Sequence, residues 1–277
     1  MNLIQTAMRC TGYGICAVVL TGVMQYASAQ SKTITLIAED DWFPYSAQRA
    51  GKSIGFAVDV VHAAYASQGV DVKFKVASFK SCLTQVEDGA ELGCFDIHRD
   101  DDTKQHFLFP EEYLFTDTGG IYDMTGEGLP EKVNPQDLVG HRVGYTNGGI
   151  YGDFLDKAAG IQREFAMSDL SNLRKLQAGR QEYSLVSTIS AEYIFKTHPE
   201  DFQVKPRLAG IISNQKMYVG FSLKRNDSKQ AAALLDAGLI KIRANGTYKK
   251  IESEWLRSYL PVEKKIPQNP RNNLKLR

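Results

Sequence analysis

Hydrophobic and polar positions along the first third of the chain predict strands and helices in turn. Residues 32–38 are β-branched and partly alternating, which favours a strand, and 56–68 carry apolar side chains on one helical face. A strand over 70–79, a short helix over 80–88 and a buried strand over 92–97 follow. This β-α-β-α-β order predicts a parallel sheet with helices on its faces.

The same alternation continues through the rest of the chain. The further predicted strands are 119–123, 142–145, 161–166, 183–187 and 216–223. The further predicted helical segments are 135–138, 150–159, the segment between Ser168 and Gly179, 191–197, 227–245 and 248–260.

The order of these elements predicts an α/β chain of two lobes, each a mostly parallel sheet flanked by helices. Residues 30–121 and 217–260 are expected to form lobe 1, and 122–216 to form lobe 2 as an insertion into it. The tail 261–277 is polar, basic and interrupted by proline, so we expect it to be disordered.

The first 29 residues have the pattern of a signal peptide. Arg9 precedes the apolar stretch 15–20, and Ala27-Ser28-Ala29 forms an A-x-A cleavage site. The sequence therefore predicts export to the periplasm and a mature N-terminus at Gln30. A membrane anchor is the alternative, but the apolar stretch is shorter than the about 20 residues that a spanning helix needs.

Charge and cysteine content narrow the class of protein. The formal net charge is +1, which gives no electrostatic case for nucleic acid as a partner. Cys82 and Cys94 are the two cysteines that remain after cleavage. An oxidising compartment favours a disulfide between them, with two buried free thiols as the alternative. Two cysteines without His at ligand spacing do not make a zinc site, and no other metal or cofactor is expected.

Polar residues follow directly after the predicted buried strand 92–97. His98 and Arg99 stand at the carboxyl end of this strand, where ligands bind in open α/β sheets. The run Asp100-Asp101-Asp102 is expected to cap a helical turn that begins at Thr103, which is more common for such a run than cation binding. Three carboxylates there also argue against a highly anionic ligand.

Several segments together resemble the periplasmic solute-binding proteins of family 3, the polar amino-acid-binding class associated with ABC transporters. The resemblance covers about 34–256. It is carried by DDWFPY at 40–45, GFAVDVV at 55–61, FLFPEEY at 107–113, VGYTNGGIYGDF at 143–154, AGRQEYSLVST at 178–188 and GFSLKRND…IRANGTYKKIESEW at 220–255. The family implies a type II periplasmic-binding-protein fold, in which two hinge strands join lobes that close over a ligand.

The resemblance also implies site residues, some of which depart from the family's pattern. Its stacking aromatic falls on Trp42, its polar contact three residues earlier on Glu39, and its carboxylate-contacting Ser or Thr on His98. The Arg that grips the α-carboxylate falls on Thr103, and the Asp that holds the α-amino group falls on Ser187. The Gly-Thr-Thr turn of the second lobe falls on Gly148-Gly149-Ile150, which keeps only its backbone N–H groups.

Each of these positions also has a structural interpretation. Arg99 is the substitute for the missing Arg, or strand alternation turns it away toward Asp100 or Asp102. His98 contacts ligand or is a hydrogen-bonded wall residue. Trp42 is a stacking platform or a core aromatic, and Tyr45 lines the site or packs in the core. Further along, Tyr151 is expected to line the wall of the second lobe, where Gly148-Gly149 form an anion-binding turn or a plain turn.

These features favour a monomeric, non-enzymatic receptor that captures a small polar solute and delivers it to an ABC transporter permease. One alternative is an enzyme of the same fold that resembles cyclohexadienyl dehydratases, with His98 or Glu39 as the acid. A second alternative is a sensory or accessory domain.

Overall fold

The structure is a computed structural model that describes residues 32–124 and 130–257 of the compact unit 31–277. Most of its strands form one long mixed sheet, and the remaining three form a second, small sheet. The strand order of the long sheet is β10-β9-β11-β8-β12-β6-β1-β5, and β7 (Phe107–Leu108) pairs with β12. The predictions for the signal peptide, its cleavage site and the tail 261–277 lie outside the described residues. Within those residues, no helix is both long enough and apolar enough to cross a membrane.

Each end of the sheet has its own set of parallel strands. In the first lobe β1 (Lys32–Glu39) runs parallel to β5 (Val70–Ala77) and β6 (Gly93–His98). In the second lobe the parallel strands are β9 (Arg142–Thr146), β10 (Gln162–Ala166) and β11 (Tyr183–Ser187). The predicted α/β fold of two lobes with mostly parallel sheets is confirmed.

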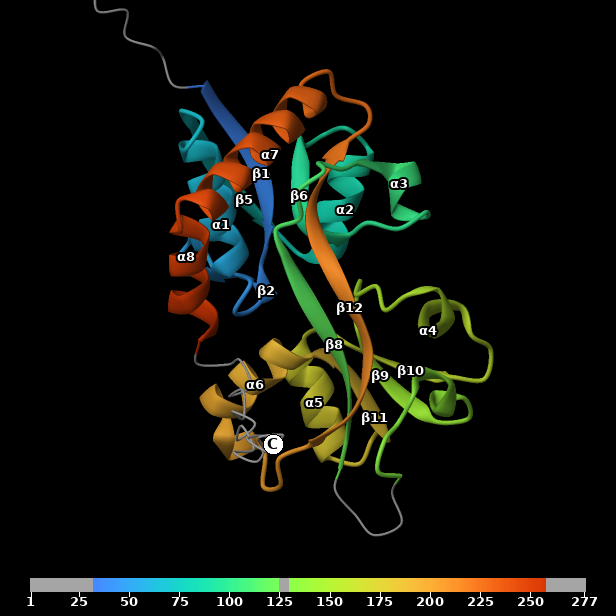
Figure 1. Ribbon diagram of the computed structural model, residues 1–277. Helices are drawn as coiled ribbons and strands as arrows, with labels where there is room; N and C mark the ends of the chain where they lie inside the picture. The colour runs from blue at the N-terminus through green and yellow to red at the C-terminus, as the bar shows by residue number, and fades with distance from the viewer. Residues whose placement is uncertain (1–31, 125–129, 258–277) are drawn as a thin grey trace, which may run out of the picture. The chain divides into compact units, whose positions relative to one another are not determined.

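Two long antiparallel strands belong to both lobes. β8 (Phe115–Asp123) pairs with β11, and β12 (Arg207–Ser222) pairs with β6. The two strands pair with each other from Asp123 to Phe115 and run side by side between the lobes in Figure 1. They are the two hinge strands that the resemblance implies.

Helices cover the sheet of each lobe. In the first lobe α1 (Phe56–Ala66), α7 (Ser228–Ala244) and α8 (Thr247–Leu256) pack together beside β5, and α2 (Phe79–Glu87) packs on β1 and β6 (Figure 1). The remaining helices are α3 (Thr103–His106), α4 (Asp153–Lys157), α5 (Asp169–Gln177), α6 (Thr188–Thr197) and the 3-10 turns η1 (Pro135–Leu138) and η2 (Pro199–Asp201).

The strands bury alternate side chains in cores on opposite faces of the sheet. In β1, Leu36 packs in the core that includes α1 and α7, whereas Ile37 packs with α2. In β8, Ile121 and Tyr122 likewise belong to different cores of the second lobe. Both faces are apolar because helices cover both, which is typical of α/β sheets. Each lobe therefore has apolar cores on both faces of its sheet, and Trp42, Met217 and Tyr151 connect these cores to the cleft.

The predicted disulfide is confirmed and fixes one edge of the site. Cys82 of α2 is bonded to Cys94 of β6, and both side chains are fully buried. The bond holds the start of α2 against the strand that carries His98.

The structure departs from the sequence-based prediction at several elements; α6, for example, begins at Thr188 rather than at 191. The hinge strands begin at Phe115 and Arg207, well before the predicted 119 and 216, because polar residues in mid-strand hide the strand pattern. The helix predicted from 150 begins at Asp153, after a turn. Between the strand predicted at 32–38 and the helix predicted at 56–68, where the sequence predicts no further element, lies β2 (Asp41–Trp42). It pairs with β3 (Ser46–Arg49), which in turn pairs with β4 (Lys52–Ile54).

Candidate functional site

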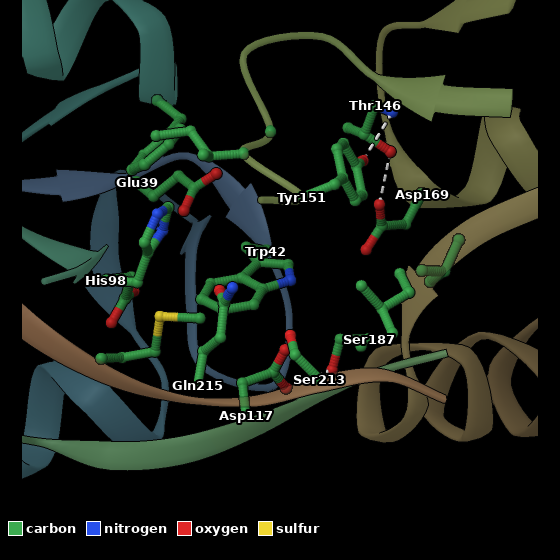
Figure 2. Close-up of a pocket in the computed structure, with 18 of the residues that line it drawn as sticks. Glu39, Trp42, His98, Asp117, Thr146, Tyr151, Asp169, Ser187, Ser213 and Gln215 are labelled. Atoms are coloured by element: carbon green, nitrogen blue, oxygen red, sulfur yellow. Dashed lines mark hydrogen bonds between the residues drawn. The ribbon is translucent and has the colours of Figure 1, made fainter. Parts of the chain in front are cut away.

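A cleft with about 800 Å³ of empty space, part of it open to solvent, lies between the lobes. The first lobe contributes side chains at the ends of β1 and β6, and the second contributes the 146–151 loop and the start of α5. Residues of β8 and β12 form its floor (Figure 2). The sequence-predicted site residues that line it are Glu39, Trp42, His98, Gly149, Ile150, Tyr151 and Ser187. Their contact with a ligand stays a prediction.

An aromatic stack supports Trp42 from behind. The Trp42 ring lies 4.6 Å from the ring of Tyr45, which is fully buried and stacks on Phe115 at 4.4 Å between centroids. Tyr45 is therefore a core residue, as the alternative interpretation has it, and does not line the cleft. Trp42 itself is only partly buried and faces the cleft, where it offers a flat apolar surface (Figure 2).

Tyr45 also orients an acid on the cleft floor. Its hydroxyl donates a hydrogen bond to Asp117 Oδ1 (2.8 Å), and Ser187 Oγ donates another to the same oxygen (2.6 Å). Burial raises the pKa of Asp117, although these two hydrogen bonds oppose the shift. Ser187, on which the resemblance places the family's amino-binding Asp, thus holds a carboxylate supplied by the neighbouring strand β8.

The end of β6 contributes two polar side chains to the cleft. His98 is buried, and its Nε2 lies 2.8 Å from Asp100 Oδ2. Asp96 occupies a bulge: Tyr218 pairs with Ile97 and Val219 with Phe95, so Asp96 has no partner across the ladder. Its φ of 75° is in the left-handed region, which Asp tolerates better than most residues.

Two further residues of the predicted site, Arg99 and Thr103, do not line the cleft. Arg99 donates to the Pro110 carbonyl (3.0 Å), stacks over the Tyr218 ring at 4.7 Å and approaches Glu111 at 3.6 Å. Thr103 is buried, and its hydroxyl donates to the His98 carbonyl (3.0 Å). Neither side chain supplies the cleft with a cation.

The Asp100 carboxylate caps the turn that begins α3. Asp100 Oδ1 accepts from the backbone N–H groups of Asp102 (3.0 Å) and Thr103 (2.8 Å). Despite partial desolvation, hydrogen bonds from Thr103 and His98 lower the pKa of Asp100. The acidic run acts as a helix cap here, in line with the structural interpretation.

In the second lobe the predicted glycine turn forms a backbone hydrogen bond within itself. Gly148 adopts a φ of 84° and does not line the cleft, and Gly149 N–H donates to the Thr146 carbonyl (3.0 Å). The Tyr151 hydroxyl accepts from Thr146 N–H (2.8 Å), so this ring closes the turn as well as lining the cleft. The Gly149 N–H group is therefore already occupied.

The start of α5 presents a further acid to the cleft. Thr146 Oγ1 donates to Asp169 Oδ1 (2.5 Å), and the side chain points into the cavity (Figure 2). Burial raises the pKa of Asp169 to about 6, against the effect of this hydrogen bond.

The lining of the cleft is strongly acidic. Among the described residues it contains four carboxyl groups, those of Glu39, Asp96, Asp117 and Asp169, and no Lys or Arg. Burial, and then the neighbouring carboxylates, raise the pKa of Glu39 and of Asp96 well above their ordinary values. Four carboxyl groups in one cleft, without a Lys or Arg among the described lining residues, favour a cationic partner.

Sequence reasoning missed three of these acids and the polar residues of β12 beside them. Asp96 was hidden within an apolar run that predicts a buried strand, and Asp117 and Gln215 lie in the parts of β8 and β12 that were not predicted. Asp169 follows the Ser168 helix cap, where an acid ordinarily stabilises the helix N-terminus. A charged residue inside an apolar strand, as at Asp96, is the one signal that was available.

The described residues offer one group with the spacing of a metal site, His198, Glu200 and Asp201. It lies outside the cleft lining, and Asp201 is already paired with Arg174 at 2.5 Å. The cleft acids, in contrast, do not bring three ligand atoms together around one position.

The two-lobed α/β fold with two strands shared between the lobes is that of the type II periplasmic binding proteins. Residues 34–258 match the model of the bacterial extracellular solute-binding proteins, family 3, and the chain belongs to this family. The comparison with curated proteins gives no match.

Solved structures show the same fold at low sequence identity. A histidine kinase sensor domain with similarity to periplasmic binding proteins superposes with a TM-score of 0.71 at 21% identity, covering 81% of this chain and 96% of that one. An ancestral arginine-binding protein bound to arginine gives 0.69 at 20%, covering 80% and 97%. ArtJ, the arginine-, lysine-, histidine-binding protein of Geobacillus stearothermophilus, gives 0.68 at 19%, covering 82% and 96%.

Proposed function

We propose that the protein is an exported, monomeric solute receptor that captures a small polar solute between its lobes and delivers it to an ABC transporter permease. The observation that carries the proposal is the composition of the cleft: Trp42 and Glu39 face it from the first lobe, and Tyr151 and Asp169 face it from the second (Figure 2). A solute there contacts both lobes at once. Family membership and structural neighbours named as binding proteins support a receptor rather than an enzyme.

Capture would work through bending of β8 and β12. A ligand shifts the balance between open and closed forms only by its greater affinity for one of them. Contacts to both lobes exist together only when the lobes approach, so a solute that bridges them favours the closed form. The proposed lobes are 30–121 with 217–260, and 122–216.

The N-terminal segment fits this role. We propose that 1–29 directs export to the periplasm and is removed after Ala29. Intact-mass measurement of protein recovered from the periplasm of an expressing cell should then give a chain that begins at Gln30. A full-length chain retained in the membrane fraction would contradict this part of the proposal.

Calorimetric titration with a panel of amino acids, amines and organic acids tests the receptor function. At least one compound should bind, and Trp42→Ala should abolish its binding without a change in the unfolding temperature of more than a few degrees. Trp255→Phe is the matched control, since Trp255 lies on α8 and bonds Asp59 at 2.6 Å rather than lining the cleft. Absence of binding across the panel would refute the receptor function.

A sensory role is the second candidate. The similarity to a histidine kinase sensor domain supports it at the level of the fold. Binding of the same solute in the same cleft is expected in either role, and pull-down with a transporter permease would distinguish them.

A further inference from the structure

The acids of the cleft come from three separate parts of the fold and surround the space where a solute would lie. In the first lobe, Glu39 is the last residue of β1 and Asp96 lies at the bulge of β6. Asp117 is on the hinge strand β8, and Asp169 begins α5 of the second lobe. Glu39 and Asp169 face the cavity from opposite walls (Figure 2). Negative charge is therefore distributed along the cleft rather than concentrated at one point.

Asp96 contributes a buried carboxyl group that has no hydrogen-bond partner within the protein. Its side chain is 4% exposed, and neither carboxylate oxygen has a hydrogen-bond partner. A buried polar group without a partner is costly, and one placed by a β-bulge in left-handed backbone costs still more. Bulges next to functional sites re-aim a side chain, and this one places the buried carboxyl group of Asp96 directly beside the cleft that it helps to line. A cationic ligand would supply the missing partner.

An inorganic cation does not fit this arrangement. Divalent ions in proteins take several oxygen ligands within about 2.6 Å of the metal, which brings the ligand atoms close to one another. No three acid or imidazole groups of the cleft converge in that way among the described residues. Carboxylates spread over two lobes instead match a molecule with cationic groups at separate positions.

The described lining of the cleft also lacks a Lys or Arg that could pair with an amino acid's carboxylate. Thr103 stands where the resemblance places a carboxylate-binding Arg, and Arg99 is held away by Pro110 and Tyr218. The Gly149 N–H group donates within its own turn. A ligand carboxylate would therefore enter a site with four acids and no cationic side chain among the described lining residues.

We propose that the ligand is a small organic dication without a carboxylate, such as a linear diamine or an alkylamine that carries a guanidinium group. One nitrogen group binds Glu39 of the first lobe, next to the buried charge of Asp96, and the other binds Asp169 of the second. The hydrocarbon between them lies against Trp42, while Asp117 and Gln215 face its middle from the floor. This inference rests on the receptor function proposed above and specifies its solute class.

The same arrangement gives a reason for closure. Carboxylates of the two lobes repel each other in the empty cleft, since the charge of Asp169 contributes to the raised pKa of Glu39. A dication between them removes that repulsion and adds attraction to both lobes, and both effects increase as the lobes approach. The ligand then binds the closed form more tightly than the open form.

Matched ligands that differ only in the carboxylate test the proposal by calorimetry. Cadaverine is compared with lysine, and agmatine with arginine, with glutamine and glutamate as neutral and anionic probes. In each pair the decarboxylated compound should bind at least about tenfold more tightly, the equivalent of one unfavourable charge contact. Equal or tighter binding of lysine and arginine would overturn the proposal.

Variants locate the two cation sites. Asp96→Asn and Asp169→Asn should each weaken cadaverine binding roughly 100-fold, the loss expected for one member of a buried charge pair. Asp71→Asn, an exposed acid on β5, is the matched control and should bind as the parent does. Thermal unfolding of each variant verifies that it is folded, and unchanged cadaverine affinity in both folded cleft variants would overturn the proposal.

The outcomes separate this inference from the receptor function. Glutamine or glutamate binding that Trp42→Ala abolishes, without binding of diamines, would keep the receptor function and overturn the dication. Absence of binding by every compound in the panel would overturn both.

Discussion

Replacing Asp96 with asparagine should make the ligand-free protein more stable while weakening ligand binding. Asparagine has nearly the same size and also tolerates left-handed backbone, so the bulge of β6 is retained. The substitution removes the negative charge of a carboxyl group that is buried without a partner and leaves a neutral polar group in its place. Such a group costs about 1–3 kcal/mol, and more when it is charged.

The gain should depend on pH because burial and Asp117 raise the pKa of Asp96. An acid whose pKa is higher in the folded chain than the ordinary 3.8 binds its proton more tightly there, so its contribution to stability falls as pH rises through the folded pKa. The penalty is therefore fully present above that pKa and absent below 3.8. Asp96→Asn should stabilise at pH 7.5 and approach the parent's stability as the pH falls toward 4.

Scanning calorimetry without ligand measures this effect. For a chain of this size about 2–4 °C accompanies each kcal/mol, so we expect the Tm of Asp96→Asn to exceed the parent's by roughly 4 °C or more at pH 7.5. Asp71→Asn, on the exposed side of β5, should leave Tm within about a degree. A lower Tm for Asp96→Asn at pH 7.5, or a difference that does not change with pH, would refute the reasoning.

Three further predictions follow from the same contacts. Reducing the Cys82–Cys94 bond, whose cysteines are 12 residues apart, should cost roughly 3 kcal/mol of unfolding free energy, visible as a lower urea midpoint in reductant; an unchanged midpoint would contradict it. Ligand should change the fluorescence of the parent and of Trp255→Phe but not of Trp42→Phe, and a retained change in Trp42→Phe would place the ligand elsewhere. Diamine affinity should fall about tenfold from pH 7 to pH 5 as Asp169, with a pKa of about 6, is protonated, whereas pH-independent affinity would argue against an ion pair there.

Local patterns were sufficient to predict most of the fold. β1, α1 and α5 begin at or within a residue of the predicted positions because each has a clear apolar period or cap, such as Ser168 Oγ accepting from Ser171 N–H. The sequence predicts β8 and β12 to be shorter than they are, because their central residues face the cleft and are polar. The strand pattern is lost where a strand crosses from one core to the other.

The site was harder to predict because it depends on which residues the fold brings together. The resemblance placed Glu39, Trp42 and His98 at strand ends, and the structure places them in the cleft lining. It gave no reason to look at Asp117, whose role depends on the pairing of β8 with β11 beside Ser187. The orientation of Asp96 depends on a bulge, and no residue pattern in β6 signals one.

The stability cost of Asp96 and the proposed ligand are two aspects of one arrangement. A site that must bind a cation tightly keeps carboxylates away from protein cations, and the empty protein is less stable as a result. Arg99 illustrates the point: it lies beside His98 in sequence but is held by Pro110, Tyr218 and Glu111 outside the lining.

A crystal structure of the protein with cadaverine tests the central claim most directly. We expect density along the Trp42 ring in a closed cleft, with one terminal nitrogen about 2.7–3.2 Å from Glu39 or Asp96 and the other at the same distance from Asp169. Cadaverine bound outside the cleft, or bound within it with its nitrogens directed away from these carboxylates, would contradict the account.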